Sequence, residues 1–170
     1  ADQPCELKDY VDGILPLEMN ARDCYSEEVQ LSSQELVDGM VLDACFIIEL
    51  FLKKDEDEKD SIGKDPIYGS GLLVPIAYDL LLLENQLPFF ILEDVYKRFN
   101  HEKSSFKPLR ELAMNFFSRF VLRNDAKLPG ESVEVHHLLH LVYLHFVIDQ
   151  LPSTSKLSFL CEYNFFPFQQ

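Results

Sequence analysis

Basic residues are scarce in this chain, and their scarcity excludes several classes of partner. Lys and Arg together number 15, against 29 Asp and Glu, which gives a formal net charge of −14 and a pI of about 4.6. Nucleic-acid backbones and anionic lipid surfaces carry the same sign of charge and would repel such a chain. We therefore expect no nucleic-acid partner, whereas a basic or zwitterionic protein partner is compatible with this charge.

Cysteine pairs typical of metal or redox sites are absent. Cys5, Cys24, Cys45 and Cys161 form no C-x-x-C motif, and their spacing matches neither a zinc site nor a compact secreted disulfide framework. Cys45 falls on an apolar helical face, as a small buried hydrophobic residue would. These features favour a reducing cytosolic setting, although four cysteines do not exclude disulfides.

Apolar runs long enough to cross a membrane are absent as well. The longest run, residues 72–83, has 12 residues and contains Pro75 and Asp79, so it is too short for a bilayer. Residues 1–4 lack the basic end and the apolar run of a signal peptide. We expect this chain itself to be soluble. Because it lacks an initiating Met, we also expect it to be a processed or excised piece.

The chain does contain many apolar residues, and they recur with helical periodicity. Apolar residues make up 47% of the sequence, and 14 residues are Phe, which is enough for a folded core. The periodicity predicts an all-α fold, an irregular bundle of about six helices in a single helical domain over residues 1–170. Two segments break the pattern. Residues 53–65 predict a charged mobile loop, and residues 157–170 predict an extended aromatic tail.

The strongest helical pattern runs from about residue 36 to residue 52, where apolar pairs recur for about five turns. Further apolar residues fall on the other side of this helix: Leu42, Phe46 and Leu50. We therefore expect a central helix that is covered on more than one face. Asp43 and Glu49 should lie at its edge or cap a neighbour, because unpaired buried carboxylates are costly.

Capping and breaking residues predict where the helices begin and end. Ser32 and Glu35 form the capping-box pattern that starts the central helix. Pro16 is expected to split a helical stretch over residues 6–25 into two short pieces. Three later helices are expected over residues 89–99, 106–123 and 133–149, with loops at residues 100–105 and 124–132.

Residues 79–93 form the least polar stretch of the chain, yet polar side chains interrupt it. Pro88 disfavours helix at Leu87 and suits the first position of a new helix, so two helices are expected to meet here at an elbow. Asn85 in a left-handed conformation would close the first helix. Glu84 would hydrogen-bond the free N–H groups at the start of the second helix.

The polar residues of this elbow are predicted to be structural, because buried polar groups usually exist to be hydrogen-bonded. The predicted structural motif has five residues: Asp79, Glu84, Asn85, Gln86 and Pro88. Asp79 and Glu84 could in principle do acid–base chemistry. They are five residues apart on a helix and do not share a face, so a cooperating pair is not expected.

Three histidines form the other candidate site. His136 and His140 share a helical face at i, i+4, which suits two metal ligands, and His137 lies beside them. Further ligands are missing, as is the glutamate of helical zinc peptidases. No Ser lies in a G-x-S-x-G elbow, and no Cys has the local context of a thiol protease. We therefore predict no catalytic residue, no cofactor and no metal.

Four blocks of the sequence resemble a plant family. They are YSEE at residues 25–28, LDACFIIEL at residues 42–50, LLLENQLPFFILE at residues 81–93 and HLLHLVY at residues 137–143. In this order they are similar to the blocks of the domain-of-unknown-function family number two-hundred-and-forty-seven. The resemblance covers residues 25–146 and is most specific over residues 84–90.

This resemblance implies a function that the residues alone do not. Members of the family are plant proteins, mostly of unknown activity and longer than this chain, that end in a hydrophobic membrane-anchoring segment. Because this chain lacks the N-terminal stretch and the anchor of the family, the resemblance implies that it is a fragment of a longer domain. Some are implied to be male determinants of grass self-incompatibility, which recognise small stigma peptides. The expectation is therefore a non-enzymatic recognition module at the plasma membrane, anchored only through a segment absent from this chain. Its partner would be a protein or a small secreted peptide.

The alternative is an unrecognised hydrolase or transferase. Such an enzyme would use Glu84 and Asn85, or the histidines His136, His137 and His140.

Overall fold

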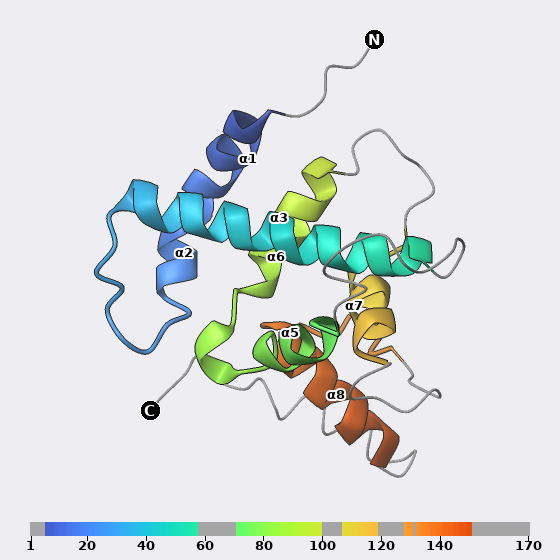
Figure 1. Ribbon diagram of the computed structural model, residues 1–170. Coiled ribbons are helices and arrows are strands. Elements are labelled where there is room, and N and C mark those ends of the chain that lie inside the picture. The colour runs from blue at the N-terminus through green and yellow to red at the C-terminus, as the bar shows by residue number, and fades with distance from the viewer. Residues whose placement is uncertain (1–5, 58–70, 100–106, 119–127, 131, 151–170) are drawn as a thin grey trace. The chain divides into compact units, whose positions relative to one another are not determined.

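Helices are the only regular elements in the described part of the chain. The computed structural model describes residues 6–57, 71–99, 107–118, 128–130 and 132–150. No strand occurs in these ranges, so the predicted all-α class is confirmed (Figure 1). The predicted loop at residues 100–105 and the aromatic tail at residues 157–170 lie outside the described residues.

The chain divides into two compact units. Unit 1 comprises Ala1–Phe46, Leu87–Phe106 and Leu151–Gln170, and unit 2 comprises Ile47–Gln86 and Lys107–Gln150. The longest helix, α3 (Ser33–Asp57), contributes residues to both units. The prediction of a single domain stays a prediction.

Unit 1 contains the short N-terminal helices, the first part of α3, and α6. The bounds of the other elements are α1 (Leu7–Ile14), η1 (Leu15–Leu17), α2 (Glu18–Arg22) and α6 (Phe89–Phe99). Pro16 lies in the 3-10 turn η1, so the predicted split of the first helical stretch is confirmed. α1 packs against α6 at Gly13, where an added Cβ would overlap the guanidinium group of Arg98. That guanidinium pairs with Asp94 one turn earlier on α6, at 2.6 Å.

The start of α3 is the predicted capping box. The backbone N–H of Ser32 donates to Glu35 Oε2 at 3.0 Å, and the backbone N–H of Glu35 donates to Ser32 Oγ at 3.3 Å. The Ser32 hydroxyl also donates to Glu35 Oε2, at 2.6 Å, and this bond, followed by the one from the Ser32 N–H, lowers the pKa of the Glu35 carboxyl from its ordinary value. Two backbone N–H groups at the start of the helix, those of Ser32 and Glu35, therefore have side-chain partners three residues away.

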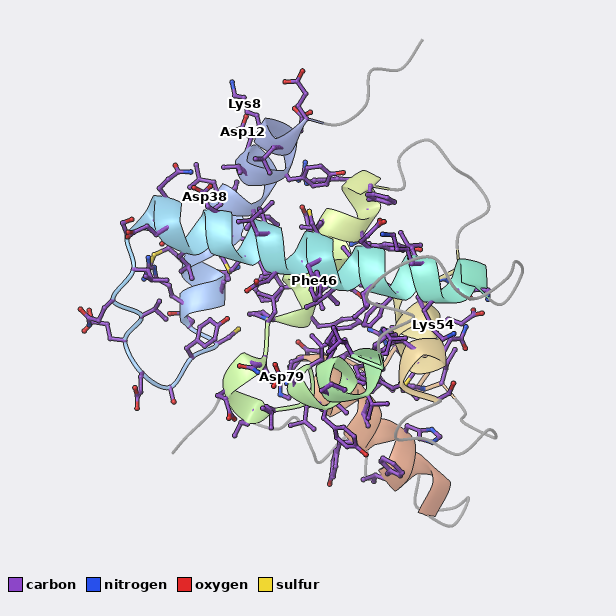
Figure 2. All side chains as sticks on the ribbon, in the orientation of Figure 1. Lys8, Asp12, Asp38, Phe46, Lys54 and Asp79 are labelled. Carbon is purple, nitrogen blue, oxygen red and sulfur yellow. The ribbon has the colours of Figure 1, made fainter. Side chains whose placement is uncertain are left out.

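The predicted burial of α3 on more than one face is only partly right. Val37, Val41 and Ala44 are fully buried, and Leu50 is buried as well. Leu42 and Phe46 are not, since 62% and 47% of their surface is exposed; Phe46 is labelled in Figure 2. Asp43 and Glu49 lie on the exposed side of the helix, as predicted for these carboxylates.

The predicted loop boundary at Lys53 is wrong by five residues, because α3 continues to Asp57. Lys and Glu favour helix, so a rise in charge does not by itself end one. Lys53 pairs with Glu49 one turn earlier at 3.5 Å, and Asp55 pairs with Lys107 of unit 2. Lys54 is buried. The rest of the predicted loop, residues 58–65, lies outside the described residues.

Unit 2 has an aromatic core between the second part of α3 and α7. Its elements after α3 are α5 (Leu73–Asp79), η2 (Leu83–Asn85), α7 (Leu109–Ser118) and α8 (Leu138–Gln150). The ring of Phe51 lies 5.2 Å from that of Phe116 and 6.0 Å from that of Phe117, centroid to centroid. The predicted inward residues of α7 are buried where they are described: Leu109, Leu112, Ala113, Phe116 and Phe117.

α8 begins at Leu138, whereas helix was predicted from residue 133. The cause is a tertiary hydrogen bond. Arg110 on α7 donates to the carbonyl oxygen of Val133 at 2.8 Å, and in a helix this oxygen would accept an N–H from four residues later. Residues 133–137 therefore stay outside the helix, although the predicted range included them.

We expect Ser32→Ala to lower the free energy of unfolding by about 1 kcal/mol, because it removes the acceptor for the Glu35 N–H. Chemical denaturation at neutral pH measures this change. Ser26→Ala is the matched control, since Ser26 is exposed in the preceding segment, and it should change the value by less than about 0.5 kcal/mol. Equal losses in the two variants would contradict a specific contribution from the cap.

Candidate functional site

The bend after α5 is built differently from the predicted elbow. α5 ends at Asp79, and its C-cap Leu80 is in the right-handed region (φ −65°, ψ −15°). The chain then tightens through hydrogen bonds to the third residue back, from Leu82 N–H to the Asp79 oxygen and from Asn85 N–H to the Leu82 oxygen. Asn85 belongs to the 3-10 turn η2, six residues beyond the end of α5, so the prediction that its left-handed backbone closes the first helix is wrong.

Pro88 lies one position before the next helix, whereas it was predicted to be the first residue of that helix. Gln86 is extended (φ −79°, ψ 125°), and Phe89 is the first residue of α6. The buried Pro88 supplies a carbonyl oxygen that accepts the Ile91 N–H at 3.0 Å. Pro88 is thus the residue before the helix, where its missing N–H leaves no donor unpaired.

Two amide side chains serve the backbone at this bend. Asn85 Nδ2 donates to the Asp79 carbonyl oxygen at 3.1 Å. Gln86 Nε2 donates to the carbonyl oxygens of Leu80 at 3.1 Å and Leu82 at 2.6 Å. These oxygens lie at and just beyond the end of α5, where carbonyl groups have no helical partner. The amides therefore complete the end of α5.

Gln86 also caps the start of α8. Its Oε1 accepts the backbone N–H of Leu139, 53 residues later in the chain, at 3.0 Å. Gln86 is buried, with 8% of its surface exposed. One neutral amide thus donates to two carbonyl oxygens and accepts from one N–H, and it joins two elements of unit 2.

Histidines complete the cap of α8. The ring nitrogen His137 Nδ1 accepts the His140 N–H at 3.1 Å, and the His137 carbonyl oxygen accepts the Leu141 N–H. His140 Nδ1 in turn accepts the His136 N–H at 3.2 Å, and the rings of His136 and His140 stack 4.8 Å apart. We call Asn85, Gln86, His137 and His140 the capping cluster.

The capping cluster requires neutral imidazole rings. Burial, with a smaller contribution from the neighbouring His136, lowers the pKa of His137 and of His140 from 6.5 to about 4. Each Nδ1 accepts a hydrogen bond, so the ring proton of the neutral form lies on Nε2. At neutral pH both rings are therefore uncharged acceptors.

The two predicted carboxylates take no part in this cluster. Asp79, at the end of α5 in Figure 2, and Glu84 are both exposed. Within the described part of the chain neither side chain has a hydrogen bond or an ion pair. The prediction that Glu84 caps the second helix is therefore wrong, and the neighbouring Gln86 has the capping role, toward α8.

The histidines are not arranged as the predicted pair on one helical face. His136 precedes α8, whose first residue is Leu138, and the Nδ1 atoms of His137 and His140 are occupied by backbone N–H groups. Among the described residues, no three His, Cys, Asp or Glu side chains lie together in a way that could hold a metal ion. The arrangement supports capping and offers no open ligand set.

The described thiols do not form a reactive centre. Cys24 and Cys45 are free and half-buried. Burial raises the pKa of each thiol from its ordinary value, so the reactive thiolate form is rare at neutral pH.

Arg22 in unit 1 is a structural centre that the sequence analysis missed. Its guanidinium pairs with Glu18 at 2.5 Å and donates to the carbonyl oxygens of Val29 at 2.7 Å and Leu31 at 2.8 Å. Ser33 Oγ, at the start of α3, donates to the same Glu18 carboxylate at 3.0 Å. The i, i+4 spacing of Glu18 and Arg22 was the available signal for the ion pair, whereas the two carbonyl contacts have no local signal.

Comparison with known proteins places the chain in a family. Residues 1–158 match the family DUF247, described as a plant protein of unknown function. The chain is also similar to UPF0481 protein At3g47200 of Arabidopsis thaliana, with 37% identity over 153 residues, 86% of this chain and 29% of that protein. No solved structure matches. The chain belongs to this plant family, as its motifs predicted, and it spans less than a third of the length of this relative.

Across the described residues, no helix is long and apolar enough to cross a membrane.

We expect Gln86→Leu to lower the free energy of unfolding by about 2–4 kcal/mol. The variant keeps a buried side chain of similar size but leaves the Leu139 N–H and two carbonyl oxygens without their partner. A fully buried group left unpaired costs roughly 1–3 kcal/mol, and these three groups are only part-buried, so their summed cost is lower than three full penalties. Glu84→Leu is the matched control, because it makes the same kind of change at an exposed position. A control variant as destabilised as Gln86→Leu would contradict the capping role.

We expect acid to weaken the cap of α8. The unfolded chain takes up protons at His137 and His140 near pH 6.5, whereas the folded chain does so only near pH 4, because the folded pKa of each is lowered to about 4. Between these values the unfolded state binds more protons, so the free energy of unfolding falls as the pH is lowered. The contribution of these rings is complete only above pH 6.5.

His137→Asn tests this pH dependence. Asn is a favourable N-cap residue whose side-chain oxygen can accept the same N–H without titrating. Chemical denaturation at several pH values should give a shallower decline between pH 6.5 and pH 4 for the variant than for the wild type. Parallel curves would exclude a linkage between His137 protonation and folding.

Proposed function

We propose that this chain is a non-enzymatic protein-interaction and recognition module. The observation that carries the proposal is the contrast between its polar and apolar side chains. The amides and two of the histidines that were candidates for chemistry pair with the backbone, and the carboxylates of Asp79 and Glu84 lie apart from them at the surface. Large apolar side chains, by contrast, lie exposed on two helices. A binding protein acts through such surfaces and needs no catalytic set.

The polar candidates are engaged in ways that disfavour catalysis. Gln86 makes three hydrogen bonds to main-chain groups, and the rings of His137 and His140 each accept one. A general base needs a free acceptor within reach of its substrate. The alternative, a hydrolase or transferase, would have to use Glu84 alone or the Nε2 side of the histidines.

Two exposed apolar groups are candidates for binding a partner. The α3 pair in unit 1 consists of Leu42 and Phe46, one turn apart. The α5 face in unit 2 consists of exposed residues on α5 and beside it, Leu72, Val74, Tyr78, Leu82 and Leu83, which are 42–56% exposed. Single exposed apolar residues are common on proteins, but several along one helix are typical of an interface.

The family resemblance adds a cellular location and a kind of partner to the proposal. In a longer plant protein, the module would be held at the plasma membrane by a segment outside residues 1–170. There it would recognise a protein or a small secreted peptide, as in cell-surface signalling or self-incompatibility.

A capture experiment tests the interaction. The immobilised chain is incubated with a plant plasma-membrane extract, the retained protein is identified, and its dissociation constant is measured with both components purified. We expect serine substitution of one apolar group, Leu42 with Phe46 or Tyr78 with Leu82, to weaken binding by about tenfold or more. His136→Gln should change the dissociation constant by less than about twofold, since it leaves both apolar groups intact.

Glu84→Ala separates the proposal from the enzyme alternative. Because Glu84 is exposed, the variant should fold with an unchanged Tm. The proposal would be contradicted if the wild type turned over a substrate in the extract and the folded variant did not. Retention of metabolites without any protein would contradict it too.

A further inference from the structure

α5 is apolar on the side that a surface helix normally makes polar. Of its seven residues only Ala77 is buried, whereas Val74 and Tyr78 are 46% and 56% exposed. Leu82, in the turn after the helix, is 42% exposed. We call these three residues the ridge: Val74 and Tyr78 are one turn apart on α5, and Leu82 follows in the turn after the helix. Ridges of this spacing pack into the groove of a second helix.

The capping cluster holds this ridge in one conformation. Asn85 fixes the Asp79 carbonyl oxygen, and Gln86 fixes those of Leu80 and Leu82. The hydrogen bond from Leu139 to Gln86 ties the same segment to the start of α8. A surface that is ordered before binding loses less conformational entropy when a partner docks.

The charge beside the ridge indicates which kind of partner can bind there. Between residues 71 and 86 the charged side chains are Asp79 and Glu84, with no Lys or Arg. Both carboxylates are exposed, and neither is paired with another described residue. A second copy of the chain would bring another net charge of −14, and an anionic membrane or a nucleic acid would also be repelled. A partner with positive charge beside its apolar side chains complements this surface.

We propose that the α5 face binds an amphipathic helical segment of a protein partner that carries Lys or Arg along the edge of its apolar face. Its apolar side chains pack on Val74, Tyr78 and Leu82, and its basic side chains lie at Asp79 and Glu84. Helices of this type use apolar anchors at i, i+4 and i+7 in such complexes. The inference rests on the proposed recognition function and assigns it a surface and a partner chemistry.

A synthetic probe tests the surface directly. The probe is a fluorescent peptide of about 18 residues with Leu and Lys at helical spacing, so that one face is apolar and the edges are basic. A second peptide has Glu at every Lys position. Fluorescence anisotropy with the full chain should show binding of the Lys peptide that weakens as NaCl rises from about 0.05 to about 0.5 M, and much weaker binding of the Glu peptide.

Matched variants locate the site. Tyr78→Ser with Leu82→Ser should weaken binding of the Lys peptide by about tenfold or more. Asp79→Asn with Glu84→Gln should weaken it and flatten its salt dependence. Leu42→Ser with Phe46→Ser removes the same kind of exposed apolar surface from unit 1 and should change the affinity by less than about twofold. Thermal unfolding confirms that each variant is folded.

Three results would overturn the assignment: an equal loss in the Leu42 and Phe46 variant, equal affinity for the Glu peptide, or self-association of the wild type that the Tyr78 and Leu82 variant abolishes. The last result would identify a second copy as the occupant. The same experiments distinguish a failure of this assignment from a failure of the proposed function. If the purified partner binds and only the α3 pair affects it, the recognition function stands and the α5 assignment fails.

Discussion

The side-chain amide of Gln86 is the interaction on which the described part of unit 2 depends most. A helix end leaves either carbonyl oxygens or N–H groups without partners, and both kinds must be satisfied when they are withdrawn from water. Gln86 meets both needs at once, because its Nε2 donates to the Leu80 and Leu82 oxygens while its Oε1 accepts the Leu139 N–H. A carboxylate at this position could accept but not donate, so it would repel the two carbonyl oxygens. The neutral amide is the chemical group that suits this position.

The same reasoning explains why the acidic neighbour is outside the cluster. Glu84 would carry its charge into a site whose donors are few, and burying an unpaired carboxylate costs far more than burying a hydrogen-bonded amide. It lies at the surface instead, as does Asp79. The bend therefore sorts its polar residues by charge, with amides inward to the backbone and carboxylates outward to solvent. That sorting gives the outer side of α5 its negative charge.

Local features of the sequence were sufficient to predict the helices, and they failed where tertiary hydrogen bonds decide. The capping box of Ser32 and Glu35, the break at Pro16 and the bounds of α6 depend on residues within a few positions, and each was predicted. The start of α8 was not, because Arg110 takes the Val133 oxygen from 23 residues away. The choice of Gln86 over Glu84 depends on Leu139, 53 residues away. Hydrophobic periodicity carries no information about such pairs.

Exposure of apolar residues was the other feature that periodicity could not predict. An apolar residue on a helix predicts a covering neighbour, which is correct for Phe51 and Val41 and wrong for Leu42 and Phe46. The helix α5 shows what an exposed apolar residue can indicate. Its residues before Asp79 are all apolar, which for a soluble helix implies burial on more than one side. The carbonyl groups at its C-terminal end are hydrogen-bonded by Asn85 and Gln86, yet Val74, Tyr78 and Leu82 stay exposed. Because side chains of the same unit satisfy the C-terminal end of α5, this end does not need a partner in order to form, and its exposed ridge is available for one that binds afterwards.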